Sequence, residues 1–507
     1  MPRDPEQHPR PDQPEHADRR NVAVVGGGVA GLVTAWELAR AGVAVTLFEA
    51  DTAFGGRIRA AEVAGVRLEL GAEAFATRGG AVAELIGELG LSGQVVSPAP
   101  LGSWLVAAAD GHATALPPAG TLGIPAAPLG ATARRALGLR GAVRAAVEPW
   151  LSPRVGAGSE TLAELVRSRL GSRVLDRLVR PVTLGVSSAA PEQIALSTLP
   201  ELCSAYDSAG SLTGAARGLR DSAVAAGGAV AGLRGGMSCL VSGLVAACER
   251  AGVELRTGAP VENIAPEGSG IRIRVAPEEL RFAAVVLALP EAETRRLLDT
   301  PHSGPVATPV EVFALVLDAT HPAVAPLVAA PRGTGALVSG AGAPTELADA
   351  IAAKALTHVT RKWPGIAGPD REVLRLSYGR VGAPPATAEL DEAGVRALAL
   401  RDAELILDAP IPEAAVLGVG RQRWEMPERG DREAPTPPAG VSLIGDWQTG
   451  AGFAALVPAA RNRARELASE LLSGGSASAF PRPAPTENFR APAGSAGAEH
   501  TTERPVS

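Results

Sequence analysis

The sequence predicts an α/β fold whose nucleotide-binding domain is Rossmann-like and is assembled from separate pieces of the chain. Three observations predict it. A strand, a glycine-rich turn, a helix and a second strand follow one another within residues 21–49. A second α/β stretch covers residues 237–289, and a last strand and helix occupy 440–472. Alternating strands and helices of this kind form parallel sheets covered by helices.

The first βαβ unit begins with Asn21–Val25, a short β-branched run typical of a buried strand. An amphipathic helix is predicted from Ala30 to about Ala41, and Val43–Glu49 is predicted as the second strand. From residue 81 to 225 the pattern is helical, with predicted helices at Ala81–Leu89, Ala131–Ala146 and Glu160–Arg180.

The second α/β stretch and the remainder of the chain complete the prediction. The predicted helices are Met237–Ala251, Glu346–Ala355, Glu392–Leu407 and Ala451–Leu472. The predicted strands are Val253–Arg256, Ile271–Val275, Ala284–Leu289, Val310–Leu317, Val373–Tyr378 and Gly440–Ile444.

We therefore expect seven segments along the chain. A cofactor-binding domain is expected from 21–80, 226–300 and 436–472, with a helical substrate region at 81–225 and an α+β substrate domain at 301–435. Residues 1–20 and 473–507 are rich in Pro, Ser, Ala and Gly, and we expect disordered tails there.

Composition and charge exclude several function classes. The net charge is -6, so no basic face for nucleic acid is expected. The 3 cysteines fit neither a disulfide framework nor a zinc site, and the histidines share no metal-ligand spacing, so we expect no metal. No apolar run approaches the ~20 residues that span a bilayer. We expect a cytoplasmic protein with at most peripheral membrane contact. The sequence leaves open whether the protein forms a homodimer.

The turn Gly26-Gly27-Gly28-Val29-Ala30-Gly31 is predicted to hold a dinucleotide pyrophosphate. The first glycine of the G-x-G-x-x-G pattern permits the tight turn, the second lets the phosphates approach the backbone, and the third lets the helix pack on the sheet. The helix N-terminus then faces the negative phosphates.

A carboxylate and a second glycine pair follow the next strand. Glu49, followed by Ala50, closes that strand about twenty residues after the turn, where a carboxylate accepts hydrogen bonds from ribose hydroxyls. Gly55-Gly56-Arg57 comes directly after, an arrangement typical of FAD enzymes rather than NAD enzymes.

The C-terminal segment supports FAD over NAD as the cofactor. Leu443-Ile444-Gly445-Asp446 ends a strand in Gly-Asp, as the second cofactor contact of two-part FAD folds does. Asp446 is expected to bind ribitol or groups beside the pyrophosphate. The helix start at Ala451-Gly452-Phe453 is expected to face the isoalloxazine ring.

The chain resembles the protoporphyrinogen/coproporphyrinogen oxidases, the FAD enzymes of haem synthesis within the amine-oxidase-like flavoprotein superfamily. The resemblance covers about residues 20–470. Glu69–Phe75 is similar to the family's "ELGAESF". The more specific stretches are Leu122-Gly123-Ile124-Pro125 and Lys354-Ala355-Leu356-Thr357 with Lys362-Trp363-Pro364.

The resemblance implies a site and a reaction. Gly71, Ala72, Glu73 and Ala74 would line the flavin, and Val261 would meet the adenine side through its backbone. The flavin N5 would take hydride equivalents from a porphyrinogen and O2 would reoxidise it to give H2O2, with no catalytic side chain required. Family members from high-GC organisms are mostly assigned to coproporphyrinogen III, which favours that substrate over protoporphyrinogen IX.

Two departures from the family pattern keep other functions open. The family's segment before the last strand is replaced by a shortened, charged link with Arg423-Trp424-Glu425-Met426-Pro427-Glu428, and Gly445-Asp446-Trp447 is closer to carotenoid desaturases and amine oxidases. An amine oxidase or polyene desaturase, and a flavin-binding paralogue without turnover, therefore remain alternatives. Among the arginines that could bind substrate carboxylates, we name Arg78, Arg180, Arg375 and Arg380.

Overall fold

The structure is a computed structural model. The structure describes residues 21–108, 111–117, 121–225, 230–300, 307–340, 351–427, 434–450 and 452–473.

A five-stranded parallel sheet forms the centre of the predicted cofactor domain. Its strand order is β10-β2-β1-β14-β20. The strands are β1 (Asn21–Val25), β2 (Ala44–Phe48), β10 (Glu254–Arg256), β14 (Ala284–Leu287) and β20 (Val441–Leu443). They come from three distant stretches of sequence, which confirms the expected Rossmann-like α/β fold class.

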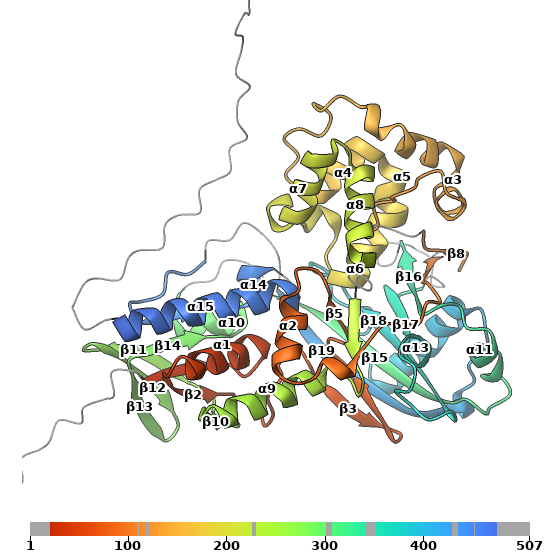
Figure 1. Cartoon of the computed structure of the whole chain (residues 1–507). Coiled ribbons are helices and arrows are strands. Elements are labelled where there is room, and N and C mark those ends of the chain that lie inside the picture. Colours follow the sequence, from red (N-terminus) through yellow and green to blue (C-terminus); the bar gives the residue numbers. More distant parts are fainter. Residues whose placement is uncertain are drawn as a thin grey trace, which may run out of the picture. The chain divides into compact units, whose positions relative to one another are not determined.

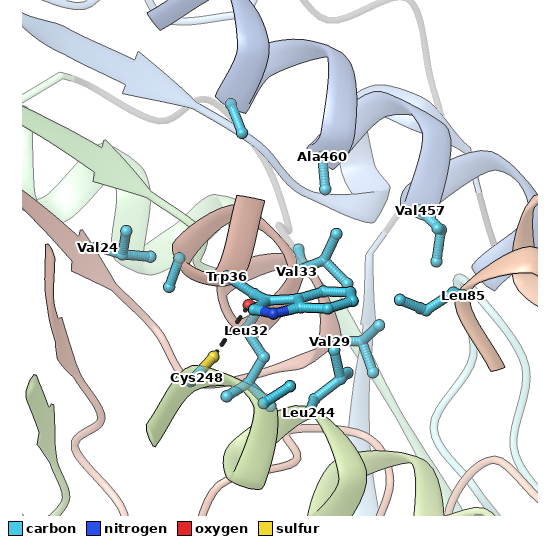
Figure 2. Close-up of a cluster of buried hydrophobic side chains, with 14 of the residues drawn as sticks. Val24, Val29, Leu32, Val33, Trp36, Leu85, Leu244, Cys248, Val457 and Ala460 are labelled. Atoms are coloured by element: carbon cyan, nitrogen blue, oxygen red, sulfur yellow. Dashed lines mark hydrogen bonds between the residues drawn. The ribbon is translucent and has the colours of Figure 1, made fainter. Parts of the chain in front are cut away.

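Three helices pack on one face of this sheet, and Figure 1 shows them lying together. They are α1 (Val29–Arg40), α9 (Ser238–Arg250) and α15 (Phe453–Ser473). Figure 2 shows Trp36 of α1 among apolar side chains from α9 and α15, including Leu244 and Val457. Burial of this cluster joins the N-terminal βαβ unit to the C-terminal helix.

A three-stranded antiparallel sheet covers the other face of the parallel sheet. It consists of β11 (Asn263–Glu267), β12 (Gly270–Val275) and β13 (Glu278–Phe282). Ile271 and Ile273 pack with Ala23 and Val25, the β1 side chains that point away from the helices. Alternation of β1 side chains between the two layers explains why Val22–Val25 are all apolar.

A seven-stranded mixed sheet forms the predicted α+β substrate domain, in the order β19-β15-β18-β17-β16-β7-β8. In chain order the strands are β7 (Trp104–Ala107), β8 (Ala113–Ala115), β15 (Ala307–Asp318), β16 (Gly335–Ser339), β17 (Ala355–His358), β18 (Arg371–Tyr378) and β19 (Val416–Pro427). Helices α11 (Ala325–Ala329) and α13 (Glu392–Leu407) bury their apolar sides on it.

The helices of residues 131–225 gather into one cluster, as predicted for this part of the helical region (Figure 1). The prediction is wrong for its first part, because Trp104–Ala107 and Ala113–Ala115 are strands β7 and β8 of the mixed sheet. The helices of the cluster are α3 (Ala131–Ala146), α4 (Leu162–Leu170), α5 (Ser172–Val174), α6 (Arg180–Ser187), α7 (Pro200–Ala209) and α8 (Leu212–Ala225), with a π-helical turn at Leu175–Val179. The prediction of one unbroken helix over Glu160–Arg180 is wrong. Gly171 has a φ of +91°, which ends α4 and starts a new helical segment.

Short elements connect these layers. They are β3 (Ala60–Val63), β4 (Val66–Glu69), β5 (Phe75–Ala76), β6 (Val95–Val96), β9 (Val230–Leu233), and helices α2 (Ala81–Glu88), α10 (Glu291–Leu297), α12 (Val359–Lys362) and α14 (Asp446–Thr449).

Two predictions in the substrate domain are corrected. Residues 346–350 of the predicted helix Glu346–Ala355 lie outside the described residues, but Ala355 begins strand β17 between β16 and β18. The segment Arg423–Glu428 was interpreted as a charged link, whereas its described residues up to Pro427 end strand β19. Pairing with neighbouring strands overrides the helix propensity of alanine in the first case.

None of the helices in the described part of the chain combines the length and the apolar character needed to cross a bilayer.

Candidate functional site

The glycine turn joins β1 to α1, and three of its glycines are required by the protein's own packing. A Cβ on Gly27 would lie 2.4 Å from Phe54 Cδ1. Gly26 has a φ of +105°, and a Cβ there would lie 2.4 Å from the Ala288 carbonyl oxygen. A Cβ on Gly31 would lie 1.8 Å from the Gly26 carbonyl oxygen. Gly26 and Gly31 match the tight-turn and helix-packing roles predicted for them.

Gly28 differs, because nothing in the part of the chain that the structure describes requires a glycine there. Its backbone is extended, with φ −72° and ψ −179°, which any residue adopts. A Cβ on Gly28 would meet only the Gly56 Cα, at 3.9 Å. The turn therefore leaves open space directly before the first turn of α1, where a ligand's phosphates can approach the backbone.

The carboxylate of Glu49 is held beside the turn at the end of β2. The Gly27 N–H donates to Glu49 Oε2 at 2.7 Å, and the Asp51 N–H donates to Oε1 at 2.9 Å. A carboxylate oxygen accepts more than one hydrogen bond, so this carboxylate can still accept from hydroxyl groups of a ligand. Ala50, the next residue, is exposed.

The Gly55-Gly56 pair lies along the glycine turn. The Gly55 N–H donates to the Gly27 carbonyl at 2.9 Å, and Gly28 and Gly55 form a parallel bridge. A Cβ on Gly56, whose φ is +55°, would come within 3.2 Å of the Gly28 Cα. Small residues on both loops therefore keep the space at Gly28 clear.

Arg57 and Asp446, predicted as two separate cofactor contacts, form an ion pair with each other. Arg57 Nη2 also donates to the Glu425 carbonyl at 3.3 Å. The pair joins the segment after β2 to the C-terminal segment, and both side chains keep part of their surface exposed. The structure thus brings the two predicted cofactor segments together through their own charges.

The C-terminal segment begins differently from the prediction. The predicted helix Ala451–Leu472 corresponds to α15, and an additional short helix, α14, starts at Asp446, directly after Gly445. Gly452 has a φ of +99° and precedes Phe453, the first residue of α15. Ala451 lies outside the described residues.

The loop Gly71-Ala72-Glu73-Ala74 packs against the Arg57 segment. The Ala72 N–H donates to the Arg57 carbonyl at 3.1 Å, and a Cβ on Gly71 would lie 1.9 Å from that same oxygen. Trp424 of β19 donates its indole N–H to the Leu70 carbonyl at 2.8 Å and packs beside Gly71. Trp424, which lies in the segment that departs from the family pattern, therefore contacts the loop at Gly71.

The Glu73 carboxylate forms ion pairs with two cations from the substrate domain. Arg375 Nη2 lies 2.9 Å from Glu73 Oε2, and Lys362 pairs with the other oxygen. Burial raises the pKa of Glu73, but Arg375 and Lys362 more than offset this and leave the pKa below its usual range. The role of Lys362 was missed, since its partner is far away in sequence.

Val261 lies in the segment that runs beside Glu49. The Ala259 N–H donates to the Glu49 carbonyl at 2.9 Å, and Val261 itself is buried. This places Val261 at the Glu49 end of the sheet, the end expected for an adenosine moiety.

Three of the arginines named for substrate carboxylates already have carboxylate partners. Arg375 binds Glu73 and also donates to the Glu69 and Gly71 carbonyls. Arg180 binds Glu192 at 2.7 Å, and Arg78 lies 3.7 Å from Glu201. The structure therefore gives Arg375 and Arg180 structural roles within the protein.

Within the described residues, no group of three or more His, Cys, Asp or Glu is placed to hold a metal ion.

Comparisons with known proteins agree on one family. Residues 29–457 match the model of the flavin containing amine oxidoreductases. The chain is 30% identical to a coproporphyrinogen III oxidase of Mycobacterium tuberculosis over 468 residues, 87% of this chain and 96% of the relative. A coproporphyrinogen III oxidase of Mycobacterium leprae is also 30% identical, over 89% of this chain and 99% of the relative.

A solved structure shares the fold. A protein of Exiguobacterium, provisionally described as a protoporphyrinogen oxidase, superposes with a TM-score of 0.74 and 23% identity, over 89% of this chain and 99% of that one. The matched family model covers most of the chain, from the glycine turn to α15, and the relatives match over nearly their whole length. The chain therefore belongs to the flavin-containing amine oxidoreductase family and, within it, to the group of the porphyrinogen oxidases.

Proposed function

We propose that this protein is an FAD-dependent oxidase that converts coproporphyrinogen III to coproporphyrin III with O2 as electron acceptor. The observation that carries the proposal is the similarity to coproporphyrinogen III oxidases over 96–99% of their length. The expected cofactor geometry at the glycine turn supports it.

The residues at the turn fit FAD. The open space at Gly28 lies at the N-terminus of α1, a helix of 12 residues whose first N–H groups have no intrahelical partner. Those N–H groups and the helix dipole favour a pyrophosphate there. Glu49 would accept hydrogen bonds from the ribose hydroxyls, while Gly56 and Arg57 would lie along the cofactor toward the loop at Gly71.

A bound flavin would supply the two-electron oxidation chemistry, with O2 as the acceptor and H2O2 as the product. The conversion of a porphyrinogen to a porphyrin removes six electrons, so three such turnovers are needed.

The chain's own residues bind and orient. The Arg57–Asp446 pair connects two segments of the cofactor site. Lys362 and Arg375 hold Glu73, and with it the loop that the family resemblance places against the flavin. No side-chain acid or base is assigned a proton transfer.

The test is a direct assay of the purified protein. Flavin absorbance is recorded first, and coproporphyrinogen III or protoporphyrinogen IX, prepared without oxygen, is then added in air. We expect rising porphyrin fluorescence with three H2O2 per porphyrin, faster with coproporphyrinogen III. Gly28→Val, which we expect to lack FAD, is the matched control for non-enzymatic oxidation.

The alternatives predict other outcomes. Preference for protoporphyrinogen IX would change the substrate but keep the reaction class. Bound FAD without enzymatic fluorescence from either porphyrinogen would overturn the proposal, in favour of an amine or polyene substrate or of a paralogue without turnover.

A further inference from the structure

A small cavity lies between the Glu69–Glu73 loop, the segment before α9 and the residues that follow α12. It offers about 50 Å³ to water-sized molecules, and apolar side chains such as Leu68, Leu233 and Val373 make up much of its lining. Glu69, Trp363 and Arg375 are among its lining residues, and Glu73 and Arg234 are the other charged residues in its wall.

Each of these three residues has one buried polar atom without a hydrogen-bond partner among the described residues. The atoms are Glu69 Oε2, Trp363 Nε1 and Arg375 Nε. Glu69 is only 7% exposed and Trp363 only 6% exposed, so bulk water does not satisfy them. A buried acceptor and two buried donors around one cavity are unusual, because buried polar groups are nearly always paired.

Other hydrogen bonds hold two of these side chains in place. Glu69 Oε1 accepts from the Ser238 N–H at the start of α9, at 2.8 Å. Arg375 donates to the Glu69 and Gly71 carbonyls at 2.9 and 3.2 Å, and it pairs with Glu73. Neither side chain can turn to satisfy its remaining polar atom without breaking these contacts.

The chemistry of the three atoms restricts what can bind. The Glu69 carboxylate disfavours an anion, and the two N–H groups cannot ligate a cation. A neutral molecule that both donates and accepts satisfies all three atoms, and the cavity is too small for an organic ligand. A cavity needs about 10–15 Å³ to hold one water, so this cavity is large enough for ordered water.

We propose that this cavity is a built-in site for a cluster of ordered water molecules that bridges Glu69, Trp363 and Arg375. The cluster connects the loop leading to Gly71 with the end of α12 and with strand β18. It would hold the loop in place through hydrogen bonds that no direct contact provides. This inference stands on the cavity and its polar atoms, and it is independent of the proposed substrate.

A high-resolution crystal structure of the purified, flavin-loaded protein tests the proposal. We expect at least two ordered waters in the cavity, with one at about 2.7–3.2 Å from each of the three atoms. A dry cavity, or a rearrangement in which the three side chains pair directly with each other, would overturn it.

A matched pair of variants tests the proposal in solution. Trp363→Phe removes one donor but keeps an aromatic ring, so we expect fewer long-lived internal waters by magnetic relaxation dispersion of water oxygen-17. Trp150→Phe is the control, because Trp150 is 81% exposed and far from being enclosed. An equal number of long-lived waters in both variants and the wild type would refute the site. Should Trp363→Phe not fold, the wild-type electron density alone decides.

Discussion

Substitution of two glycines of the same turn should separate ligand binding from folding. In Gly28→Ala the new methyl group fits the extended backbone and meets no protein atom closer than 3.9 Å. The apoprotein should therefore keep its stability within about 1 kcal/mol, with a tendency toward greater stability because alanine restricts the unfolded chain. In Gly31→Ala the methyl group would lie 1.8 Å from the Gly26 carbonyl oxygen. Because backbone must move, we expect a loss of about 3 kcal/mol or more.

Although Gly28→Ala should leave stability almost unchanged, we expect it to weaken FAD binding. The methyl group would occupy the space through which a pyrophosphate approaches the N–H groups of α1. One hydrogen bond to a charged group contributes about 1.5–3 kcal/mol, so its loss would weaken FAD binding about tenfold to hundredfold. The larger Gly28→Val should prevent binding altogether.

Two measurements on each variant decide the matter. FAD is titrated into the apoprotein and followed by flavin fluorescence, and the free energy of unfolding of the apoprotein is measured with urea. Wild-type FAD affinity in Gly28→Ala, or stoichiometric FAD in Gly28→Val, would refute the placement of the phosphates. A strongly destabilised Gly28→Ala apoprotein would show that the space belongs to the protein's packing.

Three further substitutions test the buried charges. Burial lowers the pKa of Lys354 to about 7, so its contribution to stability is complete above about pH 10.5 and is lost as the pH falls toward 7. The free energy of unfolding in urea should therefore rise by about 2 kcal/mol from pH 7 to 9 through this group, and Lys354→Met should abolish that rise. The same pH dependence in Lys354→Met and the wild type would contradict this. Arg169→Met should lower the free energy of unfolding by about 3–5 kcal/mol, because it removes the cation from a fully buried ion pair. The control Arg167→Met, at an exposed position, should have almost no effect, and similar shifts in melting temperature for both variants would refute the prediction. Glu73→Gln should lower the free energy of unfolding by about 2–4 kcal/mol, because it leaves two cations without their carboxylate. The control Glu62→Gln, at an exposed position, should change it little, and equal melting temperatures of the two variants would argue against the pairing.

Local patterns made much of the fold predictable. Strand Asn21–Val25 and helix Glu392–Leu407 have the predicted bounds, since each carries its own periodicity and, for the helix, an N-cap at Asp391. Helix Ala131–Ala146 also has the predicted bounds, although Gly138, with a φ of +69°, kinks it.

The failures in the fold occur where distant partners decide the structure. Ala355–His358 is alanine-containing and follows a predicted helix, but strands on both sides make it a strand. Strand β19 pairs with β15, which lies more than 100 residues earlier in the sequence. Charged residues interrupt the apolar pattern of β19, so that pattern did not predict a strand there.

The same division applies to the site. The spacing of the glycines and Glu49 is local, so the sequence alone predicted that they meet. Arg57 and Asp446 are 389 residues apart, and Lys362 is 289 residues from Glu73. No local pattern specifies such a partner, so the cations that hold Glu73 and the ion pair that closes the site needed the three-dimensional fold.

The parallel sheet has a consequence for how the protein is made. Strand β1 pairs on one side with β2, which is synthesised directly after it, but on the other side with β14, which begins at Ala284. At about 5–20 residues per second, a ribosome needs roughly 10–50 s to make the intervening chain. During that time one edge of β1 has no partner, and its apolar side chains are a site for aggregation. A nascent chain is therefore expected to depend on chaperones until β14 emerges, and truncated chains should not retain flavin.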